Sequence, residues 1–163
     1  VLVIVGLLCL SRTIGVVSAQ DQRTGGSLTI GPDETHEGDL EVTAGDVVVA
    51  GTVDGDLTAT GGSVTVSGDV TGDVTATGGS VIIERTVEGD PTATGGEVRV
   101  REAASVGGVV EATGETVTVD GTIEGDTRLD GESVAVGPTA MIDGDLTYSA
   151  DETTISDDAD TTS

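Results

Sequence analysis

The feature that most constrains the fold of this chain is a short repeat that runs along nearly all of it. The dipeptide Gly-Asp begins at Gly38, Gly55, Gly72, Gly89, Gly125 and Gly144, and Gly107-Gly108 takes its place once. The successive spacings are 17, 17, 17, 18, 18 and 19 residues. Between the markers the sequence nearly repeats itself, as in LTATGGSVTVSGDVTGD from Leu57 and VTATGGSVIIERTVEGD from Val74. A period of this length indicates a solenoid, in which each repeat packs only against its neighbours.

Each repeat contains three short segments in which apolar and polar residues alternate, separated by Gly or polar corners. In the copy that begins at Leu57, the apolar positions are Leu57, Ala59, Val64, Val66 and Val70. Alternation with period two predicts strands, which Val and Ile favour, while Gly-Gly allows a tight bend. We therefore predict an all-β fold, a single-stranded triangular β-helix of about seven rungs of 17–19 residues. The pattern does not determine the handedness of the helix.

The repeat also predicts the domain organisation of the chain. Residues 27–150 form the β-helix domain, residues 20–26 a linker, and the acidic residues 151–163 a disordered tail. A one-residue insertion near Val109 and a longer corner at residues 137–140 are expected to bulge outward without shifting the apolar columns.

Residues 1–19 are of a different kind. They begin with the apolar run VLVIVGLLCL and end in Val17-Ser18-Ala19, small residues at the spacing that a signal peptidase accepts. This pattern predicts a signal peptide cleaved between Ala19 and Gln20. A retained membrane-targeting segment is the alternative, although ten apolar residues are too few to span about 30 Å of hydrocarbon. We expect the protein to be exported and to act at the cell surface or the membrane rather than on its cytoplasmic face.

Composition excludes several classes of function. With 30 Asp and Glu against 6 Lys and Arg, the formal net charge is −24, which would repel nucleic acid. One Cys and one His exclude a disulfide framework and a three-His zinc site. All six basic residues are Arg, and so acidic a surface is suited to concentrated salt, where the Debye length falls to about 3 Å at 1 M. We therefore expect a halophilic source.

Two features could suggest a chemical site. The Gly-Asp corners would stack carboxylates, which either bind calcium or form a solvated ladder, and the nine-residue calcium-binding repeat is absent. The single His36 lies in a polar corner near one end, where a solvated or end-capping role fits it. A narrow, filled rod has no pocket, so we predict no enzyme, with no catalytic, cofactor-binding or metal-ligating residues and no cofactor.

The repeat LTATGGSVTVSGDVTGD, with Gly-Asp at a corner, resembles the bactofilin family of polymer-forming cytoskeletal proteins over residues 27–155. This resemblance implies a right-handed β-helix that stacks end to end into non-polar filaments without nucleotide. It also implies association with membrane or envelope proteins and a role as a scaffold. The chain departs from the family in lacking basic or Pro-rich tails and any Phe, which the family tends to place at a terminal rung.

The physics of sheet edges leads to the same expectation about self-assembly. The end rungs of a β-helix have unpaired strand edges that either are capped or pair with another chain. We predict contacts between copies through Leu28 and Ile30 at one end and Leu146, Tyr148 and Ile155 at the other. Tyr148 either replaces the missing Phe at this contact or simply covers the end of the core. The alternative function is a monomeric surface module for binding or adhesion.

Overall fold

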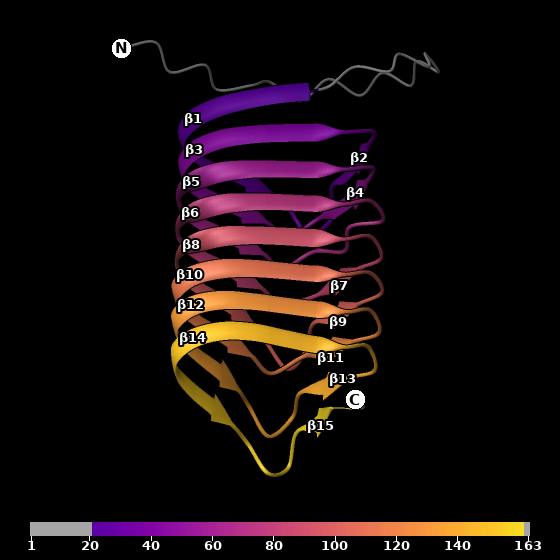
Figure 1. The fold of residues 1–163 in the computed structure, drawn as a ribbon. Coiled ribbons are helices and arrows are strands. Elements are labelled where there is room, and N and C mark those ends of the chain that lie inside the picture. Colours follow the sequence, from indigo (N-terminus) through magenta and orange to yellow (C-terminus); the bar gives the residue numbers. More distant parts are fainter. Residues whose placement is uncertain (1–20, 162–163) are drawn as a thin grey trace, which may run out of the picture.

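The computed structural model describes residues 21–161 of the chain, and within them it is a solenoid of parallel β-strands without helices (Figure 1). Eight strands of ten residues each form the largest sheet, in which every strand pairs in parallel with the next long strand along the chain. They are β1 (Asp21–Ile30), β3 (Leu40–Val49), β5 (Leu57–Val66), β6 (Val74–Ile83), β8 (Pro91–Val100), β10 (Val110–Val119), β12 (Thr127–Val136) and β14 (Leu146–Ile155).

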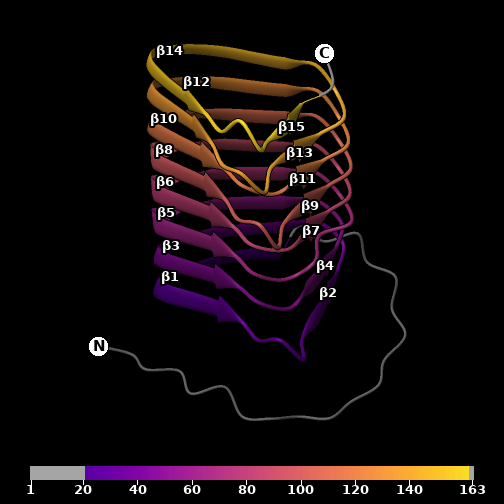
Figure 2. The ribbon, with the colours of Figure 1, turned by 90° about the horizontal axis from the view of Figure 1, so that it is seen from below.

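Short strands lie along another side of the solenoid in every turn except that of β5 (Figure 2). They are β2 (Thr35–Glu37), β4 (Thr52–Asp54), β7 (Thr86–Val87), β9 (Ser105–Val106), β11 (Thr122–Ile123), β13 (Met141–Ile142) and β15 (Asp160–Thr161). Strands β2 and β4 pair with each other, and a five-stranded sheet is formed by β7, β9, β11, β13 and β15. Val70 bridges to Val53 on one side and to Val87 on the other, and so joins the two sheets.

The first two segments of each repeat form one continuous strand rather than two. The ten-residue strand passes through the Gly-Gly pair without interruption, so a turn consists of one long and one short strand, except after β5, where a single bridge at Val70 replaces the short strand. Glycine is required there by the close approach of the turns. A Cβ atom added at Gly78 would lie 2.7 Å from the carbonyl oxygen of Gly61 in the turn before.

The predicted core is confirmed. The apolar residues of the repeat are buried in columns along the axis, as in the column Val47, Val64, Val81, Val98, Val117 and Val134. The copy that begins at Leu57 buries all five of its apolar positions. Each buried Val or Ile side chain contributes about 1.5–3 kcal/mol of transfer free energy, and the columns make this gain in every turn.

The structure differs from the prediction at both boundaries of the β-helix. It has eight long strands instead of about seven rungs, because residues 21–26, predicted as a linker, form the first part of β1. At the other end, residues 151–155 and 160–161, predicted as a tail, belong to β14 and β15. The reason is that strand pairing requires only backbone N–H and C=O groups, so a turn can form without apolar side chains.

The corners that follow the long strands have two lengths. The corner at residues 137–140 bulges outward as predicted, closed by a hydrogen bond from Ala140 N–H to the carbonyl of Gly137. The predicted insertion near Val109 was misplaced. The extra residues lie earlier in that turn, at 101–104, where Ala104 N–H donates to the carbonyl of Arg101.

Candidate assembly surfaces

The last turn of the solenoid has apolar residues at three positions that are buried in the turns from β3 to β12, and Thr153 at a fourth. In β14, Leu146 lies over Thr127, Tyr148 over Leu129, and Ile155 over Val136. No described strand covers β14, which is an edge of the large sheet. Tyr148 is therefore 47% exposed and Ile155 39% exposed, while Leu146 is half-buried.

The first turn is built differently. Leu28 and Ile30 in β1 lie over Val47 and Val49, but Ile30 is fully buried and Leu28 half-buried. Two polar side chains occupy inward columns beside them.

Arg23 takes the column of Val42, and its Nη1 lies 3.4 Å from Oε1 of Glu34. His36 takes the column of Val53 and is half-buried. Charged side chains at inward positions are a known means of protecting an edge strand. The N-terminal end is thus more polar than the C-terminal end.

The predicted interface residues therefore form two groups at opposite ends of the rod (Figure 1). Arg23 is not among the predicted residues, although a count of 19 residues back from Val42 places it in a core column. The predicted cleavage site, Ala19 and Gln20, lies outside the described residues. Within residues 21–161 there is no helix long and apolar enough to cross a membrane.

The Gly-Asp corner is a ladder of hydrogen bonds between turns. In five of the six Gly-Asp pairs, Oδ1 of the Asp accepts a hydrogen bond from a backbone N–H of the next turn. Asp73 N–H donates to Asp56 at 2.9 Å, and Asp90 N–H donates to Asp73 at 2.8 Å. The carboxylate fills the space beside the next glycine, because a Cβ atom at Gly72 would collide with Oδ1 of Asp56. This packing explains why Gly and Asp recur together.

The ladder is interrupted once. Val109 takes the Asp position, so the structure aligns Gly108-Val109, and not Gly107-Gly108, with the Gly-Asp pairs. Among residues 21–161, no group of three or more His, Cys, Asp or Glu side chains is arranged to hold a metal ion. The contacts of this corner are those of a structural ladder.

The described structure is thus an all-β solenoid whose two ends are edges of one sheet. The family model for bactofilins, described as polymer-forming cytoskeletal proteins, matches residues 70–162, more than half of the chain. The chain belongs to the bactofilin family, which is a structural and not an enzymatic family. No curated protein matches the chain, and no solved structure does.

Proposed function

We propose that this protein is a self-assembling scaffold whose solenoids stack end to end without nucleotide. The observation that carries the proposal is the last turn, in which Tyr148 and Ile155 are exposed over the core columns on an unpaired edge strand. A second copy placed against this end would cover these side chains and pair the free backbone groups of β14.

End-on contact also suits the charge of the chain. A formal net charge of −24 makes two copies repel each other, and stacking along the axis keeps most of their acidic side surfaces apart. In a non-polar filament, like ends meet. One joint then brings together Tyr148 and Ile155 of two copies, and the other brings together Leu28 and Ile30, with Arg23 close by.

The test is electron microscopy with sedimentation of residues 20–163 in about 2–3 M salt. The parent is compared with Tyr148→Asp and with a control, Val109→Asp. Val109 is 45% exposed on the side of the rod, and Asp occupies the same corner in other turns, so the control makes the same change in charge away from the ends.

Filaments are expected for the parent and for Val109→Asp. Tyr148→Asp should stop at dimers, because the joint through Leu28 and Ile30 at the other end is unchanged. Filaments in all three proteins would support the scaffold function but contradict a joint through Tyr148. Monomers of the parent at high concentration would reject the polymer and favour a monomeric surface module for binding or adhesion.

We further propose that the scaffold acts at or outside the membrane of a halophile, where it would meet membrane or envelope proteins. The segment 1–19 and the acidic, lysine-free composition support this location. Mass spectrometry of the protein purified from its host should give a chain that begins at Gln20, and an intact N-terminus would instead support a retained anchor. Circular dichroism should detect loss of structure on dialysis to well below about 0.2 M salt.

A further inference from the structure

The only histidine of the chain stands at the N-terminal end of a core column. Strand β2 places His36 beside Val53 of β4, and no other described strand pairs with β2 (Figure 2). His36 is half-buried, because no further turn covers it among the described residues. In the turns that follow, the same column consists of buried apolar residues, namely Val53, Val70, Val87, Val106, Ile123 and Ile142. An imidazole thus occupies a position that these turns give to Val or Ile.

The imidazole makes one polar contact within residues 21–161. Its Nε2 atom lies 3.4 Å from the backbone carbonyl oxygen of Asp39, and no hydrogen bond joins Nδ1 to a described residue. A neutral imidazole that carries its proton on Nε2 can donate it to this carbonyl. A protonated imidazole has a second N–H, on Nδ1, and only water is available to accept from it. The end of the column therefore satisfies the neutral form of His36 better than the charged form.

Carboxylates are frequent around His36, but none of those in the described residues forms an ion pair with the imidazole. Glu37 and Asp54 lie opposite each other at exposed positions of β2 and β4. Glu34, in the corner before β2, lies 3.4 Å from Arg23 of β1. The charged residues of these strands and corners are Asp21, Arg23, Asp33, Glu34, Glu37, Asp39 and Asp54. A proton added to His36 therefore creates a charge without a partner at an inward position.

A second copy that covers the N-terminal end removes water from His36. In the non-polar filament proposed above, like ends meet, so each joint of this kind covers two such imidazoles. A neutral imidazole loses little when it leaves water, whereas an imidazolium without an ion pair loses much of its hydration energy. The joint therefore favours the neutral side chain over the protonated one.

We propose that His36 makes the N-terminal joint sensitive to pH, so that a proton on the imidazole separates the two copies. The inference rests on the proposed scaffold function. Histidine ordinarily changes its charge between about pH 5 and pH 8. The joint binds fewer protons than the separate ends, so association is strongest at the upper end of this range and is lost as the pH falls. Acidified filaments then break into dimers that remain joined through Tyr148 and Ile155.

The sign of this effect distinguishes it from the general acidity of the chain. Acidification adds protons to carboxylates, lowers the formal net charge of −24 in magnitude and so reduces the repulsion between copies. The acidic side chains alone would therefore strengthen association at lower pH. His36 predicts the opposite, a joint that weakens.

The test measures the N-terminal joint alone, in a Tyr148→Asp background in which the other joint is blocked. Sedimentation equilibrium in about 2–3 M salt gives the dissociation constant of the dimer at about pH 8 and about pH 5.5. His36→Gln keeps a neutral polar side chain, and His36→Arg keeps a positive charge at both pH values. The control adds Val109→His to His36→Gln and so places a histidine on the exposed side of the rod. All proteins are purified as the host processes them, and far-UV circular dichroism checks that each is folded.

The expected change is large enough to measure. For a histidine with the reference pKa of about 6.5, a joint that admits only the neutral form weakens about tenfold for each imidazole at about pH 5.5. The dissociation constant of the Tyr148→Asp dimer should therefore rise about tenfold or more on acidification. We expect no such rise in His36→Gln or in the Val109→His control, and weak dimers of His36→Arg at both pH values.

Several results would overturn the inference. An equal rise in His36→Gln would assign the effect to another group, such as the amino terminus, which also titrates in this range. Tight dimers of His36→Arg, a rise restored by Val109→His, or Tyr148→Asp monomers at both pH values would contradict a joint controlled by His36. If Tyr148→Asp dimers ignore pH while the parent forms filaments, the scaffold stands and this inference fails. If the parent forms no filaments at about pH 8 but acid separates the Tyr148→Asp dimers, the polymer fails and the pH-sensitive joint stands.

Discussion

A single hydroxyl group inside the core gives a sharp test of the packing. Thr127 is the only buried polar residue among residues 22–161, and its Oγ1 makes no hydrogen bond with them. It lies between Val110 and Leu146 in a column whose other members from Leu40 onward are apolar. Replacing it with Val keeps the β-branched shape and removes the unpaired hydroxyl.

The expected gain follows from the cost of that hydroxyl. A buried polar group without a partner costs about 1–3 kcal/mol, so Thr127→Val should raise the free energy of unfolding by this amount. For a chain of this size the melting temperature should rise by about 2–4 °C for each kcal/mol. Few single substitutions are stabilising, so a rise would be diagnostic.

The assay is urea and thermal unfolding followed by far-UV circular dichroism, at a concentration where sedimentation finds monomers. The control is Thr113→Val, the same replacement at an exposed position of β10, which should stay within about 0.5 kcal/mol of the parent. A midpoint for Thr127→Val that is unchanged or lower would refute the reasoning, because it would mean that the hydroxyl is satisfied in solution.

Two further predictions concern the corners. Gly78→Ala places a methyl group against a backbone carbonyl of the turn before and should cost about 1–3 kcal/mol of stability, whereas Gly26→Ala meets nothing within 4 Å; equal unfolding midpoints for the two variants would contradict the model of close turns. Asp73→Ala removes the acceptor of the next ladder N–H and should cost about 1 kcal/mol, while Asp73→Asn keeps an acceptor and should cost less. Chemical denaturation of both Asp73 variants checks the order, and the reverse order would show that the hydrogen bond to the next turn does not stabilise the corner.

The columns of the core could be predicted because the repeat itself encodes them. In a solenoid, a residue one period further along the chain lies directly beside its counterpart, so Val64 and Val81 must stack once the period is known. The same rule would have placed Arg23 over the core. It was overlooked because its turn contains too few apolar residues to be recognised as part of the repeat.

The predicted boundaries were less accurate for a related reason. Strand formation in residues 21–26 and 151–155 depends on backbone pairing with a neighbouring turn, and no side-chain pattern records it. The insertion was placed near Val109 because the marker Gly-Asp is missing there, while the extra residues lie in the corner at 101–104.

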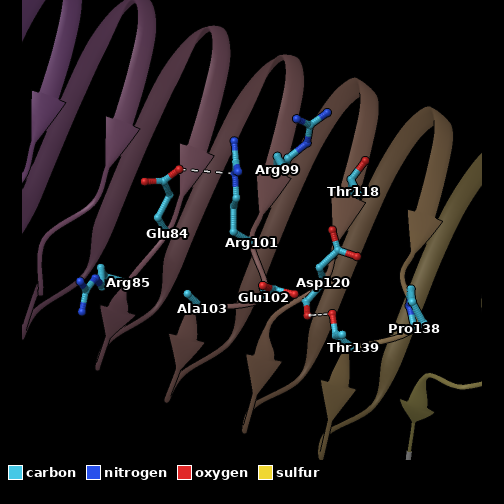
Figure 3. Close-up of a pocket in the computed structure, with 10 residues that line it drawn as sticks. All are labelled: Glu84, Arg85, Arg99, Arg101, Glu102, Ala103, Thr118, Asp120, Pro138 and Thr139. Atoms are coloured by element: carbon cyan, nitrogen blue, oxygen red, sulfur yellow. Dashed lines mark hydrogen bonds and ion pairs between the residues drawn. The ribbon is translucent and has the colours of Figure 1, made fainter.

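The amino-acid sequence is sufficient to predict the solenoid, its buried columns and its place among bactofilins, because all three follow from the period and from the apolar residues within it. The contacts made at the corners depend instead on the folded molecule. The period predicts that Asp56 and Asp73 are neighbours. Only the folded corner shows that the carboxylate of Asp56 accepts a hydrogen bond from the backbone N–H of Asp73. Likewise Arg85 and Arg101 occupy no common column. They line one groove because corners of unequal length project beside each other (Figure 3). The lengths of the corners shape the surface only when the turns are stacked.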